Sequence, residues 1–101
     1  MEVITPGHKY LAENFENKEK GQLIQFIEKI PSENSGLITL NDGTTNEELL
    51  KVLLDRMNYL DDKFPCEENK EAIKSMQQAL NWLDLRTAKR TARGVEGTHK
   101  Q

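Results

Sequence analysis

The stretch Asn41–Glu48 divides this chain of 101 residues into two parts with different hydrophobic periodicity. It reads Asn-Asp-Gly-Thr-Thr-Asn-Glu-Glu. The Asp-Gly pair is a turn signal. Thr45 with Glu48 has the spacing of a capping box, which opens an α-helix, and Thr44 with Glu47 offers the same spacing one residue earlier. Short β-like periodicity precedes the stretch and helical periodicity follows it. The sequence therefore predicts an α+β fold, in which a small antiparallel β-meander over residues 1–43 precedes a long antiparallel helical hairpin.

Three segments before this division have strand character. Residues 22–30 are rich in β-branched and aromatic types, and residues 37–40 form a second short strand. Residues 31–36 between them read as a hairpin loop that ends in glycine. Residues 9–15 are a weaker third strand, because residues 11–14 could equally form a helical turn. We expect a two- or three-stranded meander, which is too small to be stable alone.

Two helices are expected after the division. The segment 44–64 is assigned to helix one, with helical residues over roughly 46–63, and Pro65 ends it because the residue before a proline is pushed out of the α region. Helix two is assigned to 66–93, with Gly94 as its terminating residue and 94–101 as a tail. So short a connection requires antiparallel helices. The expected contact residues are Leu49, Leu50, Leu53, Met57, Leu60 and Phe64 on helix one, and Ile73, Met76, Leu80, Leu83, Thr87 and Arg90 on helix two.

Composition limits the classes of protein that this chain can belong to. Its length predicts one domain, 1–101, and its hydrophobic content of 36 % predicts a thin core that oligomerisation would complete. A net charge of −3 argues against general binding of DNA or RNA. Cys66 is the only cysteine, which excludes an intrachain disulfide. No signal peptide or membrane span is recognisable, so we expect a cytoplasmic protein without membrane contact.

The most unusual feature is a local cluster of positive charge in an acidic chain. Arg86, Lys89, Arg90 and Arg93 follow the spacing i, i+3, i+4, i+7 and project from one helix face. Cations at a helix C-terminus are also favoured by the helix dipole, by about 0.3–1 kcal/mol each. Because arginine recurs where lysine would serve the dipole equally well, and Thr87 adds a hydroxyl donor, the pattern favours a phosphate ligand.

Other candidate residues have plausible structural roles as well as ligand-binding ones. Trp82 lies off the expected contact face, so it is either packed on another part of the assembly or a stacking platform for a base. Tyr59 and Asn69 are either ordinary core and helix-start residues or an aromatic face with an amide that reads a base or ribose. His8 and His99 have no second ligand at metal spacing, and no catalytic constellation or cofactor motif is recognisable.

Three short sequence motifs, in this order along the chain, resemble those of a family of phage anti-defence proteins. They are Asn41-Asp42-Gly43-Thr44-Thr45-Asn46-Glu47-Glu48, then Lys63-Phe64-Pro65-Cys66 with Asn69, then Arg86-Thr87 followed by Arg90 and Arg93-Gly94-Val95-Glu96-Gly97-Thr98. The chain is similar to the sponge proteins that counter Thoeris immunity and to related sponges that counter cyclic-oligonucleotide (CBASS) immunity. The β-type N-terminal third resembles the Thoeris branch more closely.

The resemblance implies a protein that is not an enzyme and uses no cofactor. Family members bind host immune nucleotides, here cyclic ADP-ribose isomers with a ribose–ribose link and in some members cyclic di- or trinucleotides, and keep them from effectors. They assemble as dimers and up to hexamers. By matching positions, the resemblance implies that Arg86 and Arg90 hold the diphosphate, that Tyr59 and Asn69 contact base or ribose, and that Thr87 and Arg93 contribute.

The spacing of these residues supports an assembly. Asn69 and Arg86 are 17 positions apart in one expected helix, which is about 25 Å along its axis. One small ligand cannot touch both within one chain, so a shared pocket needs two antiparallel subunits. The alternative is a self-assembling helical-hairpin adaptor or structural phage protein, whose arginine stripe meets an acidic protein partner. A nucleotide-processing enzyme is a third, weaker hypothesis.

Overall fold

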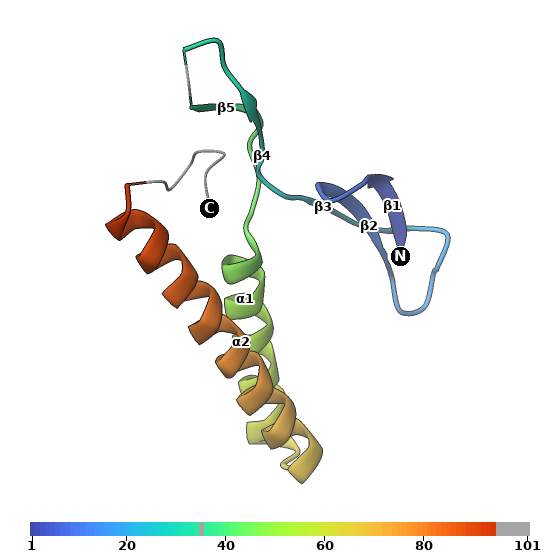
Figure 1. Ribbon diagram of the computed structural model, residues 1–101. Helices are drawn as coiled ribbons and strands as arrows, with labels where there is room; N and C mark the ends of the chain where they lie inside the picture. The colour runs from blue at the N-terminus through green and yellow to red at the C-terminus, as the bar shows by residue number, and fades with distance from the viewer. Residues whose placement is uncertain (35, 95–101) are drawn as a thin grey trace. The chain divides into compact units, whose positions relative to one another are not determined.

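The computed structural model describes residues 1–34 and 36–94. The chain packs as two compact units, Met1–Thr45 and the remainder from Asn46 onward. The first unit contains five strands and the second contains two helices (Figure 1). The predicted α+β fold, with antiparallel strands before a helical hairpin, is therefore confirmed. The assignment of 1–101 to one domain stays a prediction, and the tail beyond Gly94 lies outside the described residues.

A three-stranded antiparallel meander forms most of the N-terminal unit. Its strands are β1 (Glu2–Thr5), β2 (Lys9–Glu13) and β3 (Gly21–Gln25), in the order β1-β2-β3. The weaker predicted strand over 9–15 is thus confirmed as β2. On one face the Tyr10 ring meets the Phe26 ring edge-on, with 5.8 Å between centroids. Such aromatic pairs add specificity to a core that is otherwise small.

Strand β1 was not predicted, although the sequence carries a signal for it. The His8 amide donates to the Thr5 carbonyl at 2.9 Å, and Gly7 adopts a φ of 80°. Pro6 and Gly7 therefore occupy the central positions of a tight turn, where proline presets its φ and glycine accepts a positive φ. This turn folds β1 onto β2, so the Pro-Gly pair was the informative feature.

The prediction of one continuous strand over 22–30 is wrong. The segment splits into β3 and β4 (Glu28–Pro31), and β4 pairs with β5 (Leu37–Asn41) in a separate two-stranded antiparallel sheet. Between the two strands the Phe26 amide donates to the His8 carbonyl at 2.7 Å, and the Ile27 amide donates to the Thr44 carbonyl at 2.9 Å. The backbone changes partners at this point, and hydrophobic periodicity carries no information about that exchange.

Gly43 permits the approach that makes this exchange possible. The Thr44 amide donates to the Gln25 carbonyl at 2.9 Å, and Phe26 and Thr44 form a parallel bridge. A Cβ atom at Gly43 would overlap the Gln25 carbonyl oxygen and lie 2.6 Å from the Phe26 carbonyl carbon. Only glycine leaves room for these backbones to meet.

The helical unit is an antiparallel hairpin of α1 (Asn46–Lys63) and α2 (Glu67–Ala92) (Figure 1). Its bounds agree with the sequence prediction, since α1 begins directly after Thr45 and ends before Pro65. Cys66 is the N-cap of α2, Arg93 is its C-cap, and Gly94 follows with a φ of 71°. Glycine at this position ends a helix at low cost because it adopts the left-handed conformation without strain.

The contact face of the hairpin is narrow. In the described chain, Leu54 and Leu80 are the buried hydrophobic residues, at 8 % and 7 % exposure. The predicted face of α2 is confirmed, because Ile73, Met76, Leu80, Leu83, Thr87 and Arg90 are all buried or half-buried. On α1 the prediction is wrong for two residues, since Leu53 and Phe64 are 46 % and 76 % exposed. The contact stripe passes through Leu54 instead, and Phe64 lies beyond the last residue of α1.

Candidate ligand-binding site

A hydrogen-bonded clasp holds the turn between the two helices. The Asp61 carboxylate accepts from the Cys66 amide at 3.1 Å through Oδ1 and from the Lys70 ammonium at 2.8 Å through Oδ2. The Cys66 thiol in turn accepts from the Asn69 amide at 3.4 Å. One acidic side chain therefore joins the end of α1 to the first turn of α2, and fixes the backbone that carries Asn69.

The hydrogen bonds of the clasp shift the pKa of Asp61. The Lys70 ammonium, which donates a hydrogen bond to the carboxylate, and the Cys66 amide lower the pKa of Asp61 below its ordinary value of 3.8. Hydrogen bonds to the ionised form always act in this direction. Asp61 is therefore ionised throughout the physiological range, and its bond to Lys70 is charge-assisted.

Tyr59 lies at the same end of the hairpin as Asn69. It is 59 % exposed, and the Lys63 ammonium sits 4.8 Å from the centre of its ring. This cation–π contact holds one face of the ring on the helix surface. The phenol is accordingly an outward-facing aromatic near the turn, as a residue that meets a ligand or a second subunit must be.

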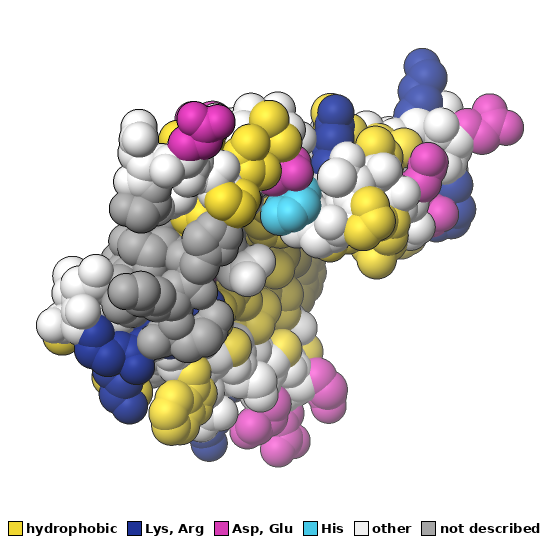
Figure 2. Space-filling model, turned by 45° about the horizontal axis from the view of Figure 1, so that its top comes forward, with side chains coloured by type: hydrophobic (Ala, Val, Ile, Leu, Met, Phe, Trp, Pro, Cys, Tyr) yellow, Lys and Arg dark blue, Asp and Glu magenta, His cyan; other side chains and the backbone are white. Residues whose placement is uncertain are grey.

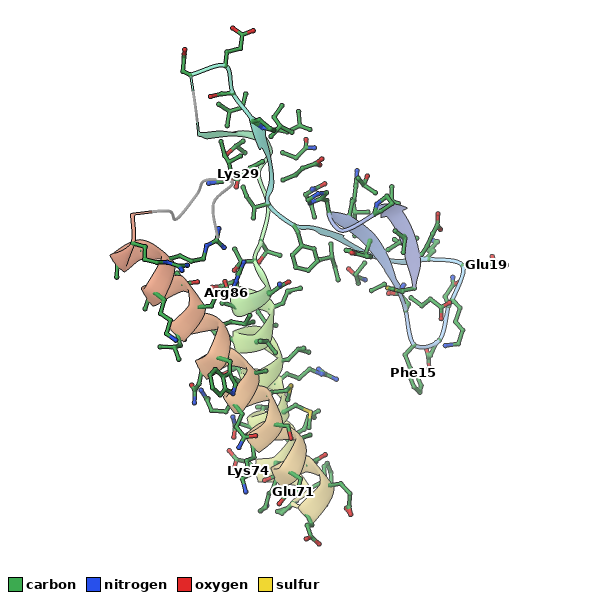
Figure 3. The ribbon with its side chains drawn as sticks, in the orientation of Figure 1. Phe15, Glu19, Lys29, Glu71, Lys74 and Arg86 are labelled. Carbon is green, nitrogen blue, oxygen red and sulfur yellow. The ribbon has the colours of Figure 1, made fainter. Side chains whose placement is uncertain are left out.

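The four basic residues lie at the other end of α2. Arg86, Lys89, Arg90 and Arg93 line a surface hollow of about 270 Å³. Figure 2 shows dark-blue Lys and Arg side chains gathered at this end of α2, and Figure 3 places Arg86 in the half of the helix away from the turn. The predicted basic stripe is thus one continuous surface. Its positive charge also lies over the negative end of the helix dipole.

The cations of this hollow differ in their surroundings. Arg86, Lys89 and Arg93 are exposed, and no carboxylate in residues 1–34 or 36–94 forms an ion pair with any of them. Arg90 and Thr87 are half-buried, in line along the helix with Leu80 and Leu83. Three cations are therefore accessible to an anion, while Arg90 is less exposed.

Two apolar residues complete the hollow: Trp82, which the sequence offered as a stacking platform or a packing residue, and Leu85, which was not predicted. Trp82 and Leu85 line it together with the cations. Trp82 is 71 % exposed and Leu85 is 43 % exposed. The signal for both was present in the sequence, because Trp82, Leu85, Arg86 and Lys89 follow i, i+3, i+4, i+7 spacing.

Within one chain the predicted site residues form two groups. Tyr59 and Asn69 lie beside the turn, whereas Arg86, Thr87, Arg90 and Arg93 lie toward the end of α2. Seventeen positions separate Asn69 from Arg86, a rise of about 25 Å along the helix. A single chain therefore brings the residues expected to bind phosphate close to one another. It does not bring them close to Tyr59 and Asn69, which are expected to contact base or ribose.

Two features are absent from the described residues. Over 1–34 and 36–94, no group of three or more His, Cys, Asp or Glu side chains could hold a metal ion. None of the helices in this part of the chain is long and apolar enough to span a bilayer. His99 and the end of the third motif, from Val95 to Thr98, lie outside the described residues.

Known proteins share this hairpin. Residues 20–88 match the family model described as "Acb2/Tad1, hairpin domain", which runs from the loop before β3 into the basic half of α2. The chain is also 37 % identical over 90 residues to a protein named "Thoeris anti-defense 1" from Bacillus phage SBSphiJ7. That alignment covers 84 % of this chain and 63 % of its relative. The chain thus spans less than two thirds of that relative's length.

The family match contains Tyr59, Asn69, Arg86 and Thr87 and stops before Arg90 and Arg93. It covers well over half of the residues, and the second comparison points to the same group of proteins. The resemblance drawn from three short sequence motifs is therefore confirmed at the level of the family. The chain belongs to the Acb2/Tad1 hairpin-domain family.

Proposed function

We propose that this chain is a phage anti-defence protein that captures an immune signalling nucleotide and holds it without degrading it. The ligand is a cyclic ADP-ribose isomer with a ribose–ribose link, and capture keeps it from the Thoeris effector in the cytoplasm of the infected cell. The observation that carries this proposal is the hollow lined by Arg86, Lys89, Arg90 and Arg93. The name of the phage relative, Thoeris anti-defense 1, supports the same biological role.

The chemistry of the hollow suits a diphosphate. Guanidinium groups bind phosphate oxygens in pairs, and such charge-assisted bonds are stronger than neutral ones. Thr87 adds a hydroxyl donor beside them, and the i, i+4, i+7 spacing of Arg86, Arg90 and Arg93 keeps the guanidiniums close together. Arg86 and Arg90 are assigned to the diphosphate, with Arg93 and Thr87 as supporting contacts.

The complete site is proposed to form between subunits. Tyr59 and Asn69 of one subunit contact the base or ribose of a ligand whose phosphates are held by the other subunit. The narrow hairpin core favours such an assembly, since exposed apolar residues remain on both helices, including Val52 (55 %) and Leu53 (46 %) on α1 and Leu85 (43 %) on α2. We propose a homodimer as the smallest competent unit and assemblies up to a hexamer.

Sequestration needs tight binding and slow release rather than catalysis. The proposed activity is therefore not enzymatic, and the residues of the hollow are donors and an aromatic ring rather than an acid–base pair. Cyclic di- and trinucleotides are proposed as further ligands of the same class.

A capture-and-release assay tests the proposal. The purified chain is incubated with cyclic ADP-ribose isomers and with cyclic di- and trinucleotides, unbound ligand is filtered away, and the retained protein is denatured by heat. Release of an intact cyclic nucleotide supports sequestration. Release of a cleaved product contradicts it, because the chain is then an enzyme.

One observation favours a second candidate function. The exposed apolar side chains of α1 and α2 also suit a self-assembling helical-hairpin adaptor that grips an acidic protein. Such an adaptor gains no thermal stability from any nucleotide, whereas a sponge gains stability that rises with the logarithm of the ligand concentration once this exceeds Kd.

A further inference from the structure

The hollow on α2 contains one residue that phosphate binding does not explain. Trp82 lies at the inner end of the basic surface, followed along the helix by Leu85, Arg86 and Lys89. A large apolar ring is costly to leave in water, and Trp82 is 71 % exposed. Its place beside three accessible cations therefore points to a partner that is both flat and anionic.

The indole is available to such a partner. In the described part of the chain, no aromatic ring stacks on Trp82 and no cation lies over its face. The described aromatic pair is Tyr10 with Phe26, and the described cation–π contact is Lys63 with Tyr59. A base could therefore approach the indole without displacing an existing contact of this kind.

The spacing along α2 matches the layout of a nucleotide. Arg86 lies one helical turn after Trp82, about 6 Å along the axis, and Lys89 lies two turns after it, about 10 Å. In a nucleotide the ribose likewise separates the base from its first phosphate, so base and phosphate bind at different points along the helix. A base on Trp82 therefore leaves its phosphates beside Arg86 and Lys89, with Arg93 further along.

We propose that Trp82 is the base-stacking residue of this site, and that a purine diphosphate lies along α2 with its base toward the middle of the helix. This inference rests on the proposed function and deepens it, because it gives the bound nucleotide a direction. It also separates two tasks on one helix face. The cations bind any diphosphate, whereas Trp82 selects a diphosphate that carries a base.

Substitution of Trp82 by alanine and by phenylalanine tests the proposal. The probes are the cyclic ADP-ribose isomers with a ribose–ribose link and, as a ligand without a base, inorganic pyrophosphate. Removal of a stacking ring weakens nucleotide binding by roughly 5- to 150-fold. We expect this loss for Trp82→Ala, substantial retention for Trp82→Phe, and an equal affinity of Trp82→Ala and the unaltered chain for pyrophosphate.

Indole fluorescence gives a second readout that a structural role would not produce. Trp82 is the only tryptophan, so all indole emission of the unaltered chain comes from this site. Stacking of a purine quenches that emission on titration with the nucleotide, while pyrophosphate leaves it nearly unchanged. This readout decides the question even if Trp82→Ala disrupts the assembly.

Phe15→Ala is the matched control, because Phe15 is 93 % exposed and does not line the hollow. Nucleotide affinity that is unchanged in Trp82→Ala but lost in Arg86→Ala overturns this inference and leaves the proposed function standing. Absence of nucleotide binding by the unaltered chain overturns both. Equal weakening of nucleotide and pyrophosphate in Trp82→Ala, without quenching in the unaltered chain, assigns Trp82 to packing and also overturns the inference.

Discussion

Asn69 and Arg86 lie on the same helix, seventeen positions apart and in opposite halves of α2. The rise between them is about 25 Å, which exceeds the reach of a compact cyclic nucleotide. If two chains pack with their α2 helices antiparallel, Asn69 of one can lie beside Arg86 of the other. The proposed function therefore places both residues in one pocket only in an assembly of at least two chains.

Arg86→Ala is expected to weaken binding of the cyclic ADP-ribose isomers by about 100-fold, because a buried phosphate loses a bidentate partner. Arg86→Lys restores only part of the affinity, since lysine keeps the charge but not the planar fork. Isothermal titration calorimetry measures both. Arg56→Ala is the matched control, because Arg56 is an exposed arginine of α1 outside the hollow. Equal losses in Arg86→Ala and Arg56→Ala would show that only net charge matters.

Leu54→Ala is expected to lower the free energy of unfolding by about 2–5 kcal/mol, whereas Leu53→Ala costs much less. Leu54 is 8 % exposed and Leu53 is 46 % exposed, so only the first leaves a cavity between the helices. Urea denaturation followed by circular dichroism compares the neighbouring substitutions. A larger loss of stability for Leu53→Ala than for Leu54→Ala would contradict the assignment of Leu54 to the face of α1 that packs on α2.

Asp61→Asn is expected to lower the melting temperature at pH 7, because the carboxylate then no longer bonds to Lys70 as an ion. The pKa of Asp61 is lowered in the folded chain, so its stabilising effect is complete above its ordinary value of 3.8 and declines as the pH falls through that lowered pKa. The difference between the unaltered chain and Asp61→Asn should therefore shrink in acid.

Scanning calorimetry between pH 7 and pH 3 measures this convergence. The control is Asp62→Asn, an exposed neighbour outside the clasp. A destabilisation by Asp61→Asn that stays constant across this range would mean that the clasp acts through shape rather than charge.

The helices were predictable from the sequence because their limits depend on local chemistry. The Thr45–Glu48 spacing, Pro65 and Gly94 each act within a few residues, and the structure bears out the bounds that they indicate. The break between β3 and β4 was not predictable in this way. It depends on bonds from Phe26 to His8 and from Ile27 to Thr44, which join segments far apart in the chain.

The candidate site also has features that the sequence predicts and features that it does not. The basic stripe follows from helical spacing alone, and the structure shows it as one surface. Trp82 was not joined to the basic stripe in the sequence analysis. Residues on the broad exposed surface of a helix can be grouped by helical spacing in more than one way, so the sequence alone does not decide which of them share one site. Under the proposed function, the relation of Tyr59 and Asn69 to the arginines depends on a second copy of the chain, so periodicity within one sequence cannot predict it.

The most direct test of the shared pocket is complementation between two variants that each lose binding. Asn69→Ala and Arg86→Ala chains are denatured, mixed in equal amounts and refolded together, and bound cyclic ADP-ribose isomer is measured after filtration. If each pocket takes Asn69 from one subunit and Arg86 from the other, a mixed dimer has one intact pocket, and the mixture recovers about a quarter of full binding capacity. A mixture that binds no more ligand than either variant alone, with mixed assemblies verified by mass spectrometry, would contradict the shared pocket.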